Sequence, residues 1–214
     1  MEPMFMLELD AIDGIKEAAN IGAGRAASEL SRLTHKKCNI SLPNIAILGA
    51  ADIQEQFDVP GSVSVSLNVR ILGDIPATMF VITKKECAQV MISYMTGVAA
   101  PATSQDISFT TQIALKQLGA ELGRAFIQSL SEFLQIKTTY DVPLLLIEAR
   151  PSECDATLKN VAKTGDRQLL VHCDFFDAGK TFKGKMIYML GRESQGKFIE
   201  RFKLLLSGED PAPI

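Results

Sequence analysis

Apolar or small residues recur in the first part of the chain at steps of three and four, at positions 12, 15, 19, 22, 26, 30 and 33. This spacing aligns them on one side of an α-helix, so the pattern predicts a helix over 12–33 with a continuous apolar stripe. The same positions shifted by one hundred are again largely apolar and predict a second helix over 112–133. The chain is therefore expected to contain two similar amphipathic helices.

The segments that follow the two helices also correspond to each other. Runs rich in β-forming residues occupy 38–48 and 138–148, and each contains a proline at the same place, Pro43 and Pro143. Because proline cannot donate a ladder hydrogen bond, these runs are expected at a sheet edge or at a strand irregularity.

Each half then continues with a hairpin and a closing helix. Alternating apolar and polar residues over 63–71 predict a half-buried strand, with a return strand after a turn near Gly73 and Asp74. Ser194 is a plausible N-cap for the last helix. The expected elements are strands 63–71 and 77–83, helix 85–95, strands 168–175 and 181–190, and helix 194–206.

These elements predict an α+β fold with an internal pseudo-duplication. Two helix-strand-hairpin-helix units, about 9–96 and 105–207, share a mostly antiparallel sheet, with the two long helices outside. A linker rich in small residues at 97–104 separates the units. Because the halves are intertwined, residues 1–214 are expected to form a single domain, with a frayed tail over 208–214.

Composition narrows the classes of partner and site. A net charge of −3 and a pI near 5.5 give no reason to expect a nucleic-acid or acidic-membrane partner. The N-terminal segment is not an export signal and no apolar run is long enough to cross a bilayer, so a cytoplasmic location is expected. Two histidines and four cysteines without a Cys-x-x-Cys pair predict no metal site, and the cysteines are expected to be small buried hydrophobes.

The polar side of the first helix carries the candidate chemistry. Asp13, Glu17, Asn20 and Gly24 fall within about 60° of one another, nearly opposite the apolar stripe. Spacing alone is typical of a solvated helix face. Mid-helix glycines, however, cost about 1 kcal/mol each relative to alanine. We expect Gly22 to let the helix approach the sheet, and Gly24 to leave room for a partner's backbone.

The residues at 22–27 also match a loose Gly-x-Gly-x-x-Ala dinucleotide fingerprint. That fingerprint requires a strand before the glycine-rich turn, whereas residues 12–21 continue a helix. Nucleotide binding is therefore not expected at this segment.

The pattern Asp13-x-x-x-Glu17-x-x-Asn20, continued by Ile-Gly-Ala-Gly and the spaced Pro43, resembles the CheC/CheX/FliY family. The repeated helix and proline at 113–143 extend the resemblance over nearly the whole chain. The resemblance implies a hydrolase of the two-component signalling system that controls chemotaxis. Its activity would be that of a phosphatase, which removes the aspartyl phosphate of a CheY-type response regulator. The expected partner is the phosphorylated regulator.

The resemblance also implies roles for the residues of the first helix. Asn20 would orient the attacking water, and Glu17 would pair with the regulator's active-site lysine; these two are the expected catalytic residues. Asp13 and Gly24 would contact the partner. No cofactor is expected on this chain, since the Mg²⁺ would belong to the regulator's own acidic pocket.

The second helix departs from this pattern. Ile113, Gln117, Ala120 and Arg124 stand one hundred residues after the four positions above, so the water-orienting amide is missing. We expect a degenerate second site around Gln117 and Ala120. Gln117 and Arg124 either face solvent or form a different contact surface.

Two other interpretations remain open. The chain could be a non-catalytic adaptor of the same fold that binds a phosphorylated regulator or a CheD-like protein. A flagellar switch component of the FliY type would predict a further switch domain beyond the two repeats.

Overall fold

The computed structural model describes residues 3–57, 63–99, 107–148, 156–164 and 167–208. The elements along the chain are α1 (Pro3–Thr34), β1 (Cys38–Ile40), β2 (Asn44–Leu48), α2 (Ala50–Phe57), β3 (Ser64–Gly73), β4 (Ala77–Lys84), α3 (Lys85–Thr96), α4 (Phe109–Leu134), β5 (Thr138–Tyr140), β6 (Leu144–Glu148), α6 (Ala156–Thr164), β7 (Gln168–Asp177), β8 (Lys183–Leu190) and α7 (Arg192–Ser207).

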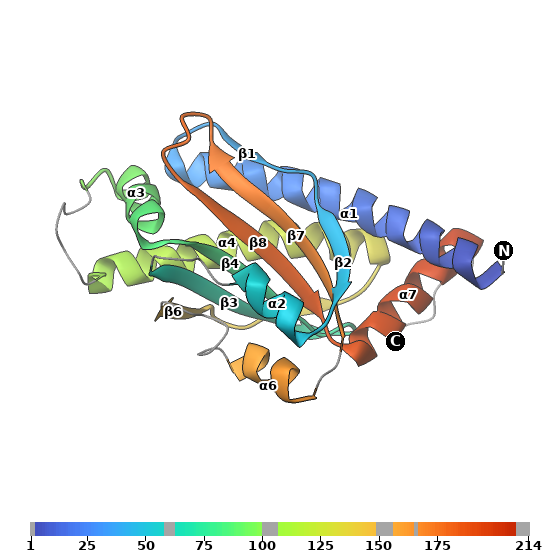
Figure 1. Cartoon of the computed structure of the whole chain (residues 1–214). Helices are drawn as coiled ribbons and strands as arrows, with labels where there is room; N and C mark the ends of the chain where they lie inside the picture. The colour runs from blue at the N-terminus through green and yellow to red at the C-terminus, as the bar shows by residue number, and fades with distance from the viewer. Residues whose placement is uncertain (1–2, 58–62, 100–106, 149–155, 165–166, 209–214) are drawn as a thin grey trace.

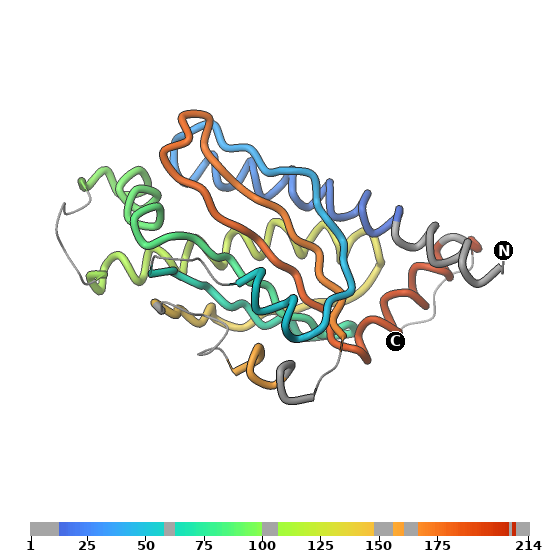
Figure 2. Tube along the Cα trace, in the orientation of Figure 1, coloured from blue at the N-terminus to red at the C-terminus, as the bar shows by residue number. Residues whose placement is uncertain are grey.

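The strands form one curled antiparallel sheet (Figure 1). Its order is β1-β7-β8-β4-β3-β5, with β2 also beside β7 and β6 also beside β3. The strands after α1 therefore pair with the second hairpin, and the strands after α4 pair with the first. Figure 2 shows the chain passing from α1 through β1 and β2 alongside β7. The predicted mixed fold with an antiparallel sheet is confirmed.

Both prolines of the repeated pattern lie at the sheet edges, as their missing donors predict. Pro43 separates β1 from β2, and Pro143 separates β5 from β6. Each run that the sequence predicts as a single strand segment is thus two short strands with an irregular link.

The two long helices form one layer on one face of the sheet. The predicted stripe of α1 is buried, with Ala19, Ala26 and Leu30 fully inaccessible. A Cβ on Gly22 would lie 3.0 Å from both Cδ2 and O of Phe126 in α4. The expectation that Gly22 brings α1 close to the sheet is therefore wrong, because the close approach is to α4.

The opposite face of the sheet carries α2 and α6, which the sequence analysis did not predict (Figure 1). Ile53 and Phe57 of α2 and Leu158 of α6 pack with sheet residues in a second apolar cluster. The ring of Phe57 meets that of Phe80 edge-on, with centroids 4.7 Å apart. This cluster covers only part of the face.

The last helix begins earlier than predicted. Its N-cap is Gly191, and the predicted cap Ser194 is buried inside the first turn. Gln195 secures this end instead, since its Nε2 donates to the carbonyls of Leu190 and Arg167 at 3.0 Å each. The predicted fraying of the tail concerns residues 209–214, which lie outside the described ranges.

Two turns hold the hairpins in place. Gly73 closes the first, as predicted, with φ +120°, and a Cβ there would meet the carbonyl oxygen of Lys137. In the second, the Asp177 carboxylate accepts from Phe182 N at 2.9 Å, Thr181 Oγ1 at 3.0 Å and Gly179 N at 3.1 Å. Burial disfavours its charged form, but these hydrogen bonds outweigh burial and lower the pKa of Asp177.

Asp177→Asn is expected to lower the free energy of unfolding by about 1–3 kcal/mol at neutral pH, because the turn loses its charged acceptor. A lowered folded pKa stabilises the protein above the unfolded value of about 4 and ceases to do so as pH falls through the folded value. The variant should therefore lose less stability on acidification than the wild type. Urea unfolding at stepwise pH checks both effects. Asp174→Asn, an exposed change on the same hairpin, is the control, and an equal loss there would contradict the assignment.

Candidate functional site

The structure places the four sequence-predicted residues on the side of α1 that faces away from its buried stripe. Asp13, Glu17 and Gly24 are exposed, and Asn20 is half-buried. We call these four residues the α1 ridge. The helical-wheel prediction of an outward-facing row is confirmed.

The ridge side chains differ in how they are held. The Asp13 carboxylate accepts from the Lys16 ammonium at 3.1 Å, and both side chains are largely exposed. No hydrogen bond or ion pair joins the Glu17 carboxylate or the Asn20 amide to any residue of the described ranges. Their hydrogen-bonding capacity is therefore available to a ligand or partner.

Gly22 and Gly24 of α1 have different surroundings. A Cβ on Gly22 would press against Phe126, whereas a Cβ on Gly24 would have no atom within 4 Å. Helix packing accounts for Gly22. It does not account for Gly24, whose missing side chain leaves open space at the end of the ridge.

Gly24→Ala is expected to raise the free energy of unfolding by about 1 kcal/mol, because alanine is the better helix former and meets nothing. Gly22→Ala should instead lower it by about 1–3 kcal/mol, since α1 and α4 must move apart. Urea unfolding of the two variants gives the comparison. Equal stabilisation of both would contradict the α1–α4 packing.

The corresponding residues of α4 form a different surface. Ile113 is 53% exposed, Gln117 is exposed and Ala120 is half-buried. Arg124 pairs with Glu121 at 3.3 Å and donates from Nε to the Tyr140 hydroxyl at 2.8 Å. Arg124 thus links α4 to β5, a contact that the sequence did not predict.

A groove of about 750 Å³ runs between α1 and α4 and brings Gly24 and Arg124 together. Its walls carry charges that sequence reasoning missed, because the antiparallel contact of the two helices is not encoded by either pattern. Arg25 pairs across the helices with Glu132 at 2.7 Å, and Arg32 pairs with Glu29 at 2.5 Å.

These arginines shift the acids beside them. The hydrogen bond from Arg32 lowers the pKa of Glu29, and the hydrogen bond from Arg25 lowers the pKa of Glu132. Both acids are therefore negative near neutral pH, and the groove presents balanced charge.

Other chemistry is sparse in the described part of the chain. No cluster of three or more His, Cys, Asp or Glu side chains suited to a metal ion is found among the described residues. Cys38 and Cys173 are buried free thiols, and burial raises the pKa of Cys173 to about 12. Cys87 is half-buried, which differs from the expectation, and Cys154 lies outside the described ranges. None of the described helices has the length and apolar character needed to cross a membrane.

The segment that carries the ridge matches a known family. Residues 9–47, which include all four ridge residues, match the CheC-like family. A Bacillus subtilis (strain 168) protein named CheY-P phosphatase CheC is 24% identical over 173 residues, covering 78% of this chain and 81% of that protein.

Solved structures share the fold. Thermotoga maritima FliY matches with a TM-score of 0.72 at 18% identity, covering 95% of this chain and 98% of that one. A chain of the CheX-CheY-BeF₃-Mg²⁺ complex from Borrelia burgdorferi matches with a TM-score of 0.52 at 13% identity, covering 81% and 96%. The predicted resemblance is thus confirmed: the chain matches the CheC-like family through its first long helix and shares the FliY and CheX fold over most of its length.

Proposed function

We propose that this protein is a phosphatase that hydrolyses the aspartyl phosphate of a CheY-type chemotaxis response regulator. The observation that carries the proposal is the α1 ridge, a free amide and a free carboxylate one turn apart on an exposed helix face, within the segment that matches the CheC-like family. The relative named as a CheY-P phosphatase and the CheX-CheY complex support it.

Asn20 is the residue suited to the chemical step. Phosphoryl transfer depends mainly on positioning and electrostatics, so hydrolysis needs a water held in line with the phosphorus. A carboxamide can both donate to and accept from that water without acting as a strong base. Half-burial restricts the side chain of Asn20 and reduces the conformational entropy lost on ordering the water.

Glu17 is the residue suited to docking. Its exposed carboxylate lies one helical turn before Asn20, so a lysine of the regulator that pairs with Glu17 would set the position of the amide. Asp13, which forms an ion pair with Lys16, would contact the partner at the edge of the ridge. The open space over Gly24 would admit the regulator's backbone.

The proposal needs no metal on this chain. The Mg²⁺ that neutralises the phosphoryl group would be held by the regulator, with this chain supplying only the orienting groups. On the interpretation of the chain as two related repeats, the α4 face lacks both Glu17 and Asn20 equivalents. We therefore propose one active ridge in each chain, with Gln117 and Ala120 marking a degenerate site.

A non-catalytic adaptor that binds a regulator or a CheD-like protein is the second candidate. The exposed Ile113 and the Arg124–Tyr140 link on α4 favour a contact surface there. Such an adaptor would hold the phosphorylated regulator without shortening the lifetime of its phosphate.

The test is to mix the purified chain with the phosphorylated CheY-type regulator of the same organism and follow the remaining acyl phosphate. The proposed phosphatase shortens its lifetime. An unchanged lifetime despite measurable binding would favour the adaptor.

A further inference from the structure

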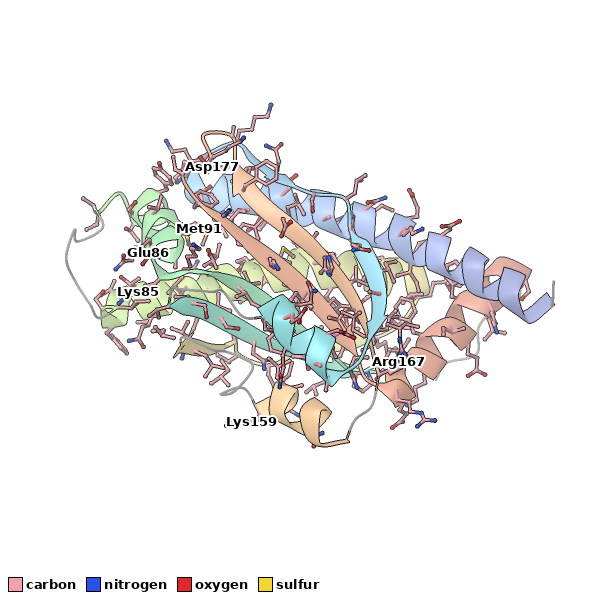
Figure 3. All side chains as sticks on the ribbon, viewed as in Figure 1. Lys85, Glu86, Met91, Lys159, Arg167 and Asp177 are labelled. Carbon is pink, nitrogen blue, oxygen red and sulfur yellow. The ribbon has the colours of Figure 1, made fainter. Side chains whose placement is uncertain are left out.

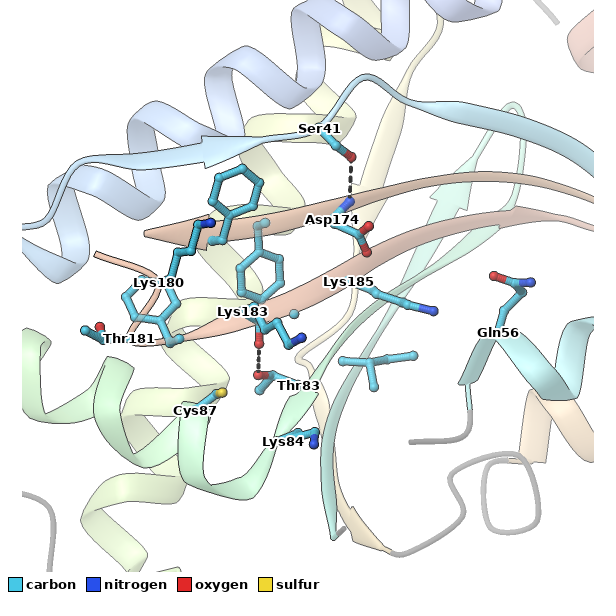
Figure 4. A pocket seen from close by; sticks show the side chains of 15 residues that line it. Ser41, Gln56, Thr83, Lys84, Cys87, Asp174, Lys180, Thr181, Lys183 and Lys185 are labelled. Carbon is cyan, nitrogen blue, oxygen red and sulfur yellow. Dashed lines mark hydrogen bonds between the residues drawn. The ribbon is translucent and has the colours of Figure 1, made fainter. Parts of the chain in front are cut away.

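A second hollow lies at the turn end of the β7–β8 hairpin, with its lysines on the sheet face opposite α1 and α4 and part of its apolar lining from the main core (Figure 4). Its volume is about 850 Å³, within the range of pockets that hold small molecules or peptide side chains. We call it the hairpin pocket. Ile82, Phe176, Phe182 and Cys87 supply apolar lining.

Four lysines line the hairpin pocket. Lys183 and Lys185 come from β8, Lys180 from the hairpin turn and Lys84 from the end of β4. Within the described ranges, none of their ammonium groups lies within 4.0 Å of a carboxylate. Their ammonium groups can therefore form ion pairs with a ligand.

The acids nearby do not balance these lysines. Asp174, opposite Lys185 in the sheet, is the single acid among the described lining residues. The buried Asp177 carboxylate is already occupied by the hairpin turn. Burial mainly lowers the pKa of His172 on the same strand face; the positive charge of Lys185 lowers it further, and the negative charge of Asp174 opposes the shift.

Further positive groups continue the patch beyond the pocket. Lys85 begins α3, and Figure 3 shows it at the same end of the molecule as Asp177. Lys36 and Lys37 lie on the α1–β1 turn, which is tied to the hairpin by a bond from Ala178 N to Lys37 O at 2.8 Å.

We propose that the hairpin pocket binds an acidic segment of a partner protein, with an apolar side chain in the pocket and carboxylates on the lysine rim. The extent of the patch over three turns exceeds what a small anion needs. Its cations are lysines, which act as compact point charges, whereas planar arginine forks are the groups best matched to phosphates. An apolar anchor surrounded by charge complementarity is typical of protein recognition.

The site is independent of the proposed phosphatase site. The α1 ridge belongs to the helix layer on one face of the sheet, and Lys183 and Lys185 project from the other. The two sites can therefore be tested separately in the same protein.

The probe is a fluorescein-labelled peptide, Glu-Glu-Phe-Glu-Glu-Leu, titrated with the full chain and followed by fluorescence anisotropy. Lys183→Gln with Lys185→Gln should raise its Kd roughly tenfold or more, because two rim charges are lost. Lys159→Gln with Lys203→Gln removes the same charge from α6 and α7 and should leave the Kd unchanged. Equal effects of the two pairs would overturn the proposal.

A second variant separates binding from folding. Lys180 has φ +55°, a conformation that glycine adopts more readily, so Lys180→Gly should preserve or raise the stability of the fold. The same variant should weaken binding of the peptide, because one rim charge is lost. Bound peptide should also slow alkylation of Cys87 by iodoacetamide, read by mass spectrometry of its tryptic fragment. An unchanged Kd for Lys180→Gly, or unprotected Cys87, would count against the site.

Two comparisons test the nature of the ligand. The same peptide with glutamine in place of glutamate should bind far more weakly. Equal binding of that peptide, or tighter binding of phosphatidylglycerol vesicles or single-stranded DNA than of the acidic peptide, would overturn the assignment to an acidic protein segment.

Discussion

Asn20→Ala is expected to slow the dephosphorylation of the CheY-type regulator by this protein roughly 10²–10³-fold, the loss typical when one positioned hydrogen-bonding group is removed. The reason is local. Alanine cannot hold the attacking water, and no other amide of the described ridge can replace Asn20. The measurement is the decay rate of the regulator's acyl phosphate at matched concentrations of wild-type and variant chain.

The control for this variant is Ser28→Ala. Ser28 is exposed on the same helix, and its hydroxyl donates to the Gly24 carbonyl at 3.0 Å, so its loss leaves the ridge amide in place. Binding of the BeF₃-treated regulator should be nearly the same for wild type and Asn20→Ala. An Asn20→Ala protein that binds normally and hydrolyses at the wild-type rate would remove Asn20 from the mechanism.

Glu17→Lys is expected to weaken binding of the phosphorylated regulator roughly tenfold to a hundredfold, because an attractive contact with a lysine becomes a like-charge contact. Unlike Asn20→Ala, this variant should recover much of its hydrolysis rate at high regulator concentration. Titration calorimetry with the BeF₃-treated regulator measures the Kd directly.

Glu55→Lys makes the same charge change on α2, on the other face of the sheet, and should leave the Kd unchanged. Replacing the regulator's active-site lysine by glutamate should restore binding to Glu17→Lys. If both glutamate variants weakened binding equally, net charge rather than docking at the ridge would explain the effect.

Local pattern predicts much of this fold. The stripes of α1 and α4 and the two hairpins follow from helical and strand periodicity, and the edge positions of Pro43 and Pro143 follow from the missing donor. The short helices α2 and α6 were not predicted because 8 or 9 residues, little more than two turns, carry a weak periodic signal. Only Ile53 and Phe57, one turn apart, mark α2.

Features that depend on long-range contacts were not predictable in the same way. The approach of Gly22 to Phe126 and the pairing of Arg25 with Glu132 require the relative placement of α1 and α4. The start of α7 just after its N-cap Gly191 depends on the carbonyls of Leu190 and Arg167, which lie outside the helix and accept from Gln195.

The candidate sites show the same division. The α1 ridge could be found from sequence because its residues share one helix. The lysines of the hairpin pocket come from β4, β8 and the turn between β7 and β8, which are separate in the sequence. The net charge of −3 is a sum over the whole chain and does not show where lysines gather on one surface.

The most direct test of the account is a turnover experiment with the regulator in large excess over the chain. Each wild-type molecule should dephosphorylate many regulator molecules and the Asn20→Ala variant should not, while both should bind the BeF₃-treated regulator. Loss of no more than one phosphate per chain, or equal turnover by wild type and Asn20→Ala, would contradict it.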